Sequence, residues 1–372
     1  MIRSSPPQAA ASDAHAGIST DAIRIGEALS SWQTLRVRQW YAVIGVVAVL
    51  TCIVALLALR FGAHPLTWAQ LWSALAFPAS GEGDVTRVIV WDVRFPRVML
   101  GLLVGASLAM TGAALQALVR NPLADPYVLG ISSGAALGAT MGLALGLGTL
   151  MGGIGLPLCA FIGGGMSIIL VYGIAVSQGT LSVYTLLLAG VIINAICSAL
   201  MMFATSILNP ASFYRVVVWL MGTLSAPNPT ALMGVGICVV VAMVWLLRFS
   251  QALNLLAIGE DASRSLGLES DRVQRMVFVV SALLTGVVVS LCGMIGFVGM
   301  VVPHLARIVC GADHRVLLPV SALAGGTLLI LADTVARTVV APAEIPVGVV
   351  TALIGGPFFL YLLITRNYRF ST

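Results

Sequence analysis

Long apolar stretches separated by short polar breaks fill this chain from about residue 41 onward. A helix needs about 20 apolar residues to cross a bilayer. Ten stretches are candidates for spanning helices, at approximately residues 41–60, 97–119, 128–148, 154–176, 183–207, 230–248, 274–295, 298–311, 316–337 and 346–365. The eighth is too short to cross alone, and Pro303 within it predicts a broken or partly inserted helix. The pattern predicts an all-α polytopic membrane protein.

The first 38 residues lack this pattern. Residues 1–20 are rich in Ala, Ser and Pro, which predicts disorder, and residues 21–40 form a polar, partly amphipathic lead-in. The apolar stretch that follows is too long for the apolar region of a signal peptide. We therefore expect an N-terminal extension over residues 1–38 and a membrane domain over residues 39–372.

Composition strengthens this interpretation. The chain is 59% apolar and 9% charged, whereas soluble domains carry about 25% charged residues. A water-soluble globule of 372 residues could not be covered by so few charges. The formal charge of +5 suits the anionic inner face of a bacterial inner membrane, and we expect no nucleic-acid partner.

All 19 basic residues are arginine. A P-loop needs a lysine to reach the phosphates of ATP, so any ATP and Mg²⁺ must be bound by another chain. The six cysteines have no metal-ligand spacing and are expected to be packing residues. We expect no catalytic residue, no cofactor and no metal site in this chain.

The arginines predict an orientation, because basic residues favour the cytoplasmic side. If both termini are cytoplasmic, thirteen arginines lie inside, at positions 3, 24, 36, 38, 120, 248, 264, 272, 275, 307, 315, 366 and 369. Six then lie outside, at positions 60, 87, 94, 97, 215 and 337. We therefore predict a cytoplasmic location for both termini.

Two segments suggest an internal repeat. Residues 107–112 read SLAMTG and residues 281–286 read SALLTG, and a proline-bearing break follows each span, at 121–126 and 296–303. The two spans enter from opposite sides, so the repeat would be inverted, as is common in transporters. Glycines at small-xxx-small spacing, such as Gly101 and Gly105, predict close helix packing.

The longest polar segment inside the bundle covers residues 249–273. Glu260 and Asp261 favour a helix start, Arg264 can pair with Glu260, and Gly267 suits a helix end. We predict two short helices hinged at Gly259, whose apolar contacts are Leu255, Leu256, Leu266 and Leu268. A docking element for a cytoplasmic partner explains this pattern best, and a helix on the membrane surface is the alternative.

Further motifs appear in a fixed order: RFPR at 94–97, GAALQ at 112–116, NPLADP at 121–126, LGISSG at 129–134, LLAG at 187–190, GE at 259–260, LGL at 266–268, GFVG at 296–299, PH at 303–304 with Arg307, AD at 332–333 with Arg337, and EIPVG at 344–348. In that order they resemble the permease subunit of binding-protein-dependent ABC importers for iron-siderophores, haem and vitamin B12. The resemblance covers residues 40–366, and the extension 1–38 departs from it.

The resemblance implies a type II importer permease with ten spanning helices, which forms a homodimer with its pathway along the dimer axis. It implies two cytoplasmic ATPase subunits, which contact the loop matching residues 255–268. It also implies a periplasmic substrate-binding protein, whose glutamates pair with the arginines matching Arg94, Arg97 and Arg337. The alternatives are membrane anchoring for Arg94 and Arg97, and an intrachain ion pair of Arg337 with Asp333.

The resemblance further implies a cytoplasmic gate at Val183 and Tyr184, although Tyr184 is bulkier than the usual gate residue. An ordinary interfacial tyrosine is the alternative. A path wall on the fifth span would then include Val191, Asn194, Ser198, Met201 and Met202, for which plain helix packing is an equal explanation. This wall is mostly apolar and uncharged, which favours haem as the cargo over a ferric siderophore or cobalamin.

His304 and Glu344 suggest a haem ligand or a proton relay, but both belong to the general family pattern, so we reject these roles. Asp125 and Asp333 are expected to cap broken helices. An ion-coupled secondary transporter is the rival function, but it would need intramembrane carboxylates, and spans two to seven have none in their interiors. A membrane enzyme would need a catalytic cluster that the sequence does not offer.

Overall fold

The computed structural model describes residues 37–76, 85–147, 154–177, 179, 181–225 and 229–365. The chain divides into two units, Met1–Val46 and Val47–Thr372. Of the first unit, the described part is the beginning of the helix Val37–Arg60. Most of the extension 1–38, including Arg3, Arg24 and Arg36, lies outside the described residues, as do Arg366 and Arg369.

Every regular element in the described ranges is helical. After the helix Val37–Arg60, the elements are α2 (Trp68–Ala76), α3 (Val85–Arg87), η1 (Val88–Arg94), α4 (Phe95–Val119), η2 (Pro126–Leu129), α5 (Ile131–Ala144), α6 (Gly155–Ala175), α7 (Val183–Ser206), α8 (Pro210–Leu220), α9 (Pro229–Arg248), α10 (Ser250–Ile258), α11 (Glu260–Ser265), α12 (Ser270–Cys292), α13 (Val298–Cys310), α14 (His314–Thr338) and α15 (Val347–Thr365).

Each of the ten predicted apolar stretches corresponds to a helix. Within the described residues, seven helices are long and apolar enough to cross a membrane, and three shorter apolar helices accompany them, at Ile131–Ala144, Val298–Cys310 and Val347–Leu362. Ten crossings therefore stay a prediction. The sequence pattern missed α2 and α8, because both are short and amphipathic, and it missed the π-helical turn η1 that leads into α4.

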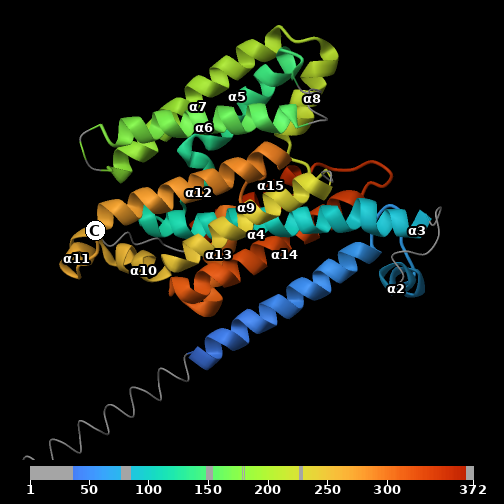
Figure 1. Cartoon of the computed structure of the whole chain (residues 1–372), viewed down its shortest axis with the longest axis horizontal. Coiled ribbons are helices and arrows are strands. Elements are labelled where there is room, and N and C mark those ends of the chain that lie inside the picture. Colours follow the sequence, from blue (N-terminus) through green and yellow to red (C-terminus); the bar gives the residue numbers. More distant parts are fainter. Residues whose placement is uncertain are drawn as a thin grey trace, which may run out of the picture. The chain divides into compact units, whose positions relative to one another are not determined.

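Helix α4 lies in the middle of the second unit and is buried along most of its length. It packs against α14 and α13, while α5, α6 and α7 pack together beside α12 (Figure 1). Glycines make the α4 contacts possible: a methyl group at Gly105 would overlap the backbone of Gly325, and one at Gly112 would overlap that of Gly299. Close backbone approach of this kind is how helices associate where lipid removes the hydrophobic drive.

The two ends of α14 belong to opposite ends of the bundle. His314 at its start contacts α10, whereas Asp333 near its finish contacts the beginning of α4. At about 1.5 Å per residue, these two residues are about 30 Å apart, which is the thickness of a hydrocarbon core. Figure 1 shows α10 and α11 at one end and α2 and α3 at the other, with α4 and α12 running in opposite directions. The opposite directions of α4 and α12 are those that an inverted repeat requires, and the cytoplasmic location of the termini stays a prediction.

The glycine contact between α4 and α13 generates a stability prediction. The Gly112→Ala substitution forces a methyl group onto the Gly299 carbonyl, and overpacking of this kind costs about 1–3 kcal/mol. We expect the Gly112→Ala variant to have a lower melting temperature in detergent, measured with an unfolding assay that does not rely on thiol labelling. The matched control is Gly165→Ala in α6, where the added methyl group meets no atom within 4 Å. Equal melting temperatures for the two variants would contradict the packing argument.

Candidate translocation cavity and docking surfaces

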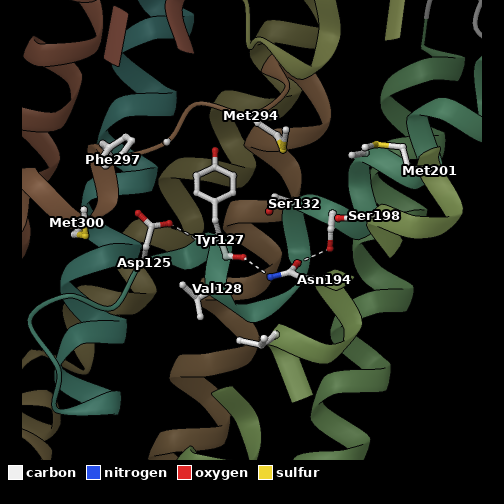
Figure 2. Close-up of a pocket in the computed structure, with 14 residues that line it drawn as sticks. Asp125, Tyr127, Val128, Ser132, Asn194, Ser198, Met201, Met294, Phe297 and Met300 are labelled. Atoms are coloured by element: carbon white, nitrogen blue, oxygen red, sulfur yellow. Dashed lines mark hydrogen bonds between the residues drawn. The ribbon is translucent and has the colours of Figure 1, made fainter. Parts of the chain in front are cut away.

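A cavity of about 640 Å³ lies where α7 meets the two helix breaks. Its lining comes from the break after α4, from α5, from α7 and from the connection between α12 and α13. Figure 2 shows Asp125, Phe297 and Met300 on one side, Asn194, Ser198 and Met201 on the other, and Tyr127 between them. Both breaks of the predicted repeat therefore contribute to one site.

The first break is ordered by polar contacts. The Asp125 carboxylate caps η2 by accepting a hydrogen bond from the Tyr127 backbone N–H at 2.8 Å, which confirms its predicted role as a helix cap. Asn194 on α7 donates to the Tyr127 carbonyl at 3.5 Å and accepts from the Ser133 hydroxyl. Helix α7 is thus tied to the break that it faces (Figure 2).

The second break is tied to the first. The Ile295 backbone N–H donates to the Tyr127 hydroxyl at 3.0 Å. Phe297, which lines the cavity, has φ of +69°, an uncommon conformation for a bulky side chain. Its Cβ occupies space that a methyl group at Gly355 of α15 would need, so the neighbouring helix accommodates the strained residue. The sequence analysis missed Tyr127 and Phe297, although the proline- and glycine-rich breaks around them were the available signal.

Four of the predicted path residues line this cavity: Val191, Asn194, Ser198 and Met201. Met202 does not line it, since it points to the exposed face of α7. Val183 and Tyr184 lie at the start of α7, at the bundle end that carries α10 and α11, and Tyr184 is exposed. The predicted wall residues are uncharged, but the cavity lining also includes Asp125, which was not among them.

The polar segment 249–273 has the predicted form. Helices α10 and α11 meet at Gly259, Arg264 pairs with Glu260 at 2.7 Å, and Gly267 has φ of +83°. Arg264 also reaches Asp271 at 2.9 Å, which joins α11 to the first turn of α12. The hydrogen bond that Arg264 donates to Asp271, together with the nearby carboxylates, raises the pKa of Arg264, so this guanidinium stays charged. Asp261 is exposed beside it.

The predicted leucine contacts need correction. Leu256 is 2% exposed and belongs to the core, and Leu255 and Leu268 are only partly exposed. They face inward because α10 turns this side toward the bundle, as the buried Leu253 one turn earlier also shows. Leu266 is 65% exposed, and the sequence analysis missed Ile258, which is 69% exposed at the end of α10. Ile258 and Leu266 are therefore the exposed apolar side chains that a partner could contact in this segment.

Asn254 ties α10 to the start of α14. Its amide nitrogen donates to Asp313 at 2.9 Å, and its oxygen accepts from the His314 backbone N–H at 2.8 Å. Asp313 also accepts from the Arg315 guanidinium at 2.7 Å. Hydrogen bonds from Arg315 first, and from Asn254, lower the pKa of Asp313 to about 2. Helix α10 is therefore joined directly to the start of α14 by hydrogen bonds.

Arg94 was predicted to dock a partner, but its guanidinium lies inside the protein. The residue is 4% exposed and donates to the carbonyls of Leu59 and Arg60 at 2.7 Å each, and to that of His64. These are carbonyls at and just after the end of the helix Val37–Arg60, where partners within the helix are missing. Arg94 thus caps this helix, a role that the sequence analysis did not consider.

Arg97 and Arg337 take part in one ion network with Asp333. The Arg97 Nε donates to Asp333 Oδ1 at 2.8 Å. The Arg337 Nε lies 3.1 Å from Asp333 Oδ2, an ion-pair distance without hydrogen-bond alignment. Arg97 Nη1 also donates to Glu344 at 2.9 Å. The intrachain pair considered for Arg337 is therefore present, and Arg97 is the one predicted docking arginine beside a surface carboxylate.

Two further residues, Asp333 and His304, were considered for roles from the sequence. Asp333 was expected to cap a broken helix, which is wrong, because it lies within α14, where it accepts a hydrogen bond from Arg97 and forms an ion pair with Arg337. His304 is buried in α13 and does not line the cavity. Among the described residues, no group of three or more His, Cys, Asp or Glu side chains could hold a metal ion.

The Asp313 contact predicts a pH-dependent stability. The Asp313→Asn variant keeps an acceptor for Asn254 but loses the charge that Arg315 stabilises. Because the native pKa lies below the ordinary 3.8, the carboxylate stabilises the fold above about pH 4, and this contribution is lost as the pH falls toward 2. We expect the free energy of unfolding of the variant to be lower than that of the wild type by at most about 1 kcal/mol at pH 7, seen as a lower melting temperature. The gap should narrow between pH 4 and pH 3, and a constant gap would contradict the assignment.

Comparison with known proteins gives the family. The profile of the FecCD transport family matches residues 50–365. A cobalamin import system permease from Halobacterium salinarum is 43% identical over 306 residues, covering 82% of this chain and 81% of the relative. A hemin transport system permease from Yersinia pestis is 38% identical over 330 residues, covering 88% and 97%.

A solved structure agrees with these relatives. An inward-facing metal-chelate type ABC transporter aligns over 88% of this chain and 100% of that chain, with a TM-score of 0.75 and 31% identity. The order of motifs, the helical architecture and the family profile all lead to the same assignment. The chain belongs to the FecCD transport family, the ABC importer permeases that its sequence resembles.

Proposed function

We propose that this chain is the permease subunit of an ATP-driven, binding-protein-dependent importer that carries haem across the inner membrane. The observation that carries the proposal is the cavity at the two helix breaks, which lies in a bundle with a separate polar surface at each end. Transporters of other folds also bind cargo where discontinuous helices meet. Relatives named as cobalamin and hemin permeases support import as the activity.

A homodimer fits the cavity best. Asn194 and Ser198 lie on a largely exposed face of α7, a helix long enough to span the membrane. Polar side chains are costly against lipid and normally face protein or a water-filled space. A second copy packed on this side would cover α7 and close the cavity into a path. Val183 and Tyr184 would then form the gate at the cytoplasmic end, with both termini on that side.

ATP hydrolysis belongs to two partner ATPase subunits, which we assign to the surface of α10 and α11. Exposed Ile258 and Leu266 offer apolar anchors, and Glu260, Asp261 and Arg264 surround them with charge. Such a surface has the apolar centre and polar rim of a protein interface. The contact of Asn254 with Asp313 and His314 would pass ATPase movement into α14.

At the other end of α14, we assign the substrate-binding protein to the surface around Arg97. An arginine fork binds a carboxylate bidentately and stays charged. Arg97 is the member of the predicted trio that reaches a surface group, whereas Arg94 and Arg337 are buried, and Arg337 shares Asp333 with Arg97. The binding protein would supply the carboxylate and release its cargo above the bundle.

The cargo assignment rests on the cavity lining. Apolar and thioether side chains dominate it, including Val191, Phe297 and the methionines Met201, Met294 and Met300. Such soft, adaptable surfaces suit a flat macrocycle that must slip through. Cobalamin is the second candidate, because Ser132, Ser133 and Asn194 form a polar patch that could meet its amides.

The ATPase-docking surface can be tested by removing its anchors. The double variant Ile258→Ser with Leu266→Ser should weaken association with the ATPase about ten-fold or more, because buried apolar anchors dominate interface energies. Pull-down and titration in detergent would measure it. Val339→Ser is the matched control, since Val339 is equally exposed at the other end of the bundle. Unchanged association in the double variant would refute the assigned surface.

Cargo identity can be tested by reconstitution. Proteoliposomes holding the permease, its ATPase and its binding protein should import haem on addition of ATP, and haem should stimulate ATP hydrolysis. Parallel assays with cobalamin and with a ferric siderophore form the comparison. If cobalamin or the siderophore enters while haem does not, the haem assignment is wrong but the importer remains. If no cargo enters and the ATPase does not bind, the importer function itself fails.

A further inference from the structure

Arg97 already has a carboxylate partner at the protein surface. Its Nη1 lies 2.9 Å and 3.2 Å from the two oxygens of Glu344, while its Nε binds the buried Asp333. The Glu344 side chain is 52% exposed, whereas that of Asp333 is 3% exposed. One of the two acidic partners is therefore fixed by burial, and the other is held only by the ion pair.

The charges of this network balance only with Glu344 in place. Arg97 and Arg337 carry two positive charges, and Asp333 and Glu344 carry two negative charges. If the Glu344 side chain rotates into solvent, the remaining three residues hold one net positive charge. The nearby Arg94 donates its hydrogen bonds to backbone carbonyls and forms no part of this ion network. A foreign carboxylate could then restore neutrality at Arg97.

The surface beside the pair has room for such a group. A hollow of about 410 Å³ is lined by Arg97 and Glu344 together with α8 and the residues after it, including Tyr214, Val217 and Thr223. Tyr214 is exposed at this hollow. An acidic side chain that enters here would reach Arg97 by displacing Glu344, without a change in the packed helices below.

We propose that Glu344 is an internal placeholder for a carboxylate of the binding protein. In the free permease it keeps Arg97 in its binding geometry and the surface neutral, and in the docked complex an aspartate or glutamate of the partner takes its place. This inference rests on the proposed docking role of Arg97. It adds that docking is a competition between an internal and an external carboxylate, so the free permease resists unspecific acidic partners.

The test measures the affinity of the full permease in lipid nanodiscs for the binding protein of its own importer. Glu344→Gln removes the competing charge from a half-exposed position, so the variant should fold. We expect binding about two- to five-fold tighter at low salt, the range of an exposed ion pair. The gain should shrink as salt rises, because surface charges are screened. Arg97→Gln should weaken binding, with melting temperatures recorded for both variants.

Asp92→Asn is the matched control. Asp92 is an exposed carboxylate in η1, close in sequence to Arg97 but outside the ion network, so it reports the effect of general surface charge. If Glu344→Gln binds the binding protein with unchanged or weaker affinity, or if Asp92→Asn gains as much affinity, the placeholder role is overturned. If Arg97→Gln still loses affinity in that case, the docking role of Arg97 is preserved. If Arg97→Gln folds and binds normally, the docking role of Arg97 fails and the placeholder fails with it.

Discussion

Backbone-to-backbone contact between helices is the constraint on which this bundle depends. In lipid there is no hydrophobic drive between apolar helices, so association requires close packing. Helix α4 achieves it on two sides, through Gly105 against Gly325 of α14 and through Gly112 against Gly299 of α13. The first contact holds α4 directly against α14, and the second holds α4 directly against α13. Both functional ends are built on the α4–α14 pair.

Different polar contacts lie at the two ends of the α4–α14 pair. At one end, Arg97, Asp333 and Arg337 form a buried ion network whose outermost member, Glu344, reaches the surface. At the other end, Asn254 joins α10 to the beginning of α14. Between them, the breaks in the helices after α4 and before α13 open a cavity beside α7. The α4–α14 pair therefore connects the ion network at one end, the cavity, and the α10 contact at the other end.

The sequence predicted the elements whose signal is local. Long apolar runs marked the apolar helices, and the acidic pair at Glu260 with Gly267 marked the two short helices of the polar segment 249–273. Roles that depend on distant partners were not predictable. Arg94 caps a helix that ends 34 residues earlier, at Arg60, and nothing near Arg94 in the sequence indicates it. Leu256 and Ile258 are both apolar residues of α10, but Leu256 is buried and Ile258 is exposed because they lie on different sides of the helix.

The two helix breaks likewise combine a local sequence signal with contacts between distant residues. Proline and glycine predicted where the chain leaves helical geometry, but the bond from the Ile295 backbone to the Tyr127 hydroxyl joins residues 168 positions apart. The strained Phe297 likewise needs Gly355 beside it. Local chemistry therefore located each half of the cavity, and only the folded chain shows that the halves meet.

If the chain crosses the membrane as proposed, the surface around Ile258 and the surface around Arg97 face opposite sides of it. Cysteine labelling with a membrane-impermeant reagent tests this arrangement directly, in a background without the six native cysteines. The exposed positions Ile258 and Val340 serve as sites, through Ile258→Cys and Val340→Cys. We predict that Val340→Cys is labelled in intact spheroplasts and Ile258→Cys only in inverted vesicles. Labelling of both sites from the same side would contradict the account.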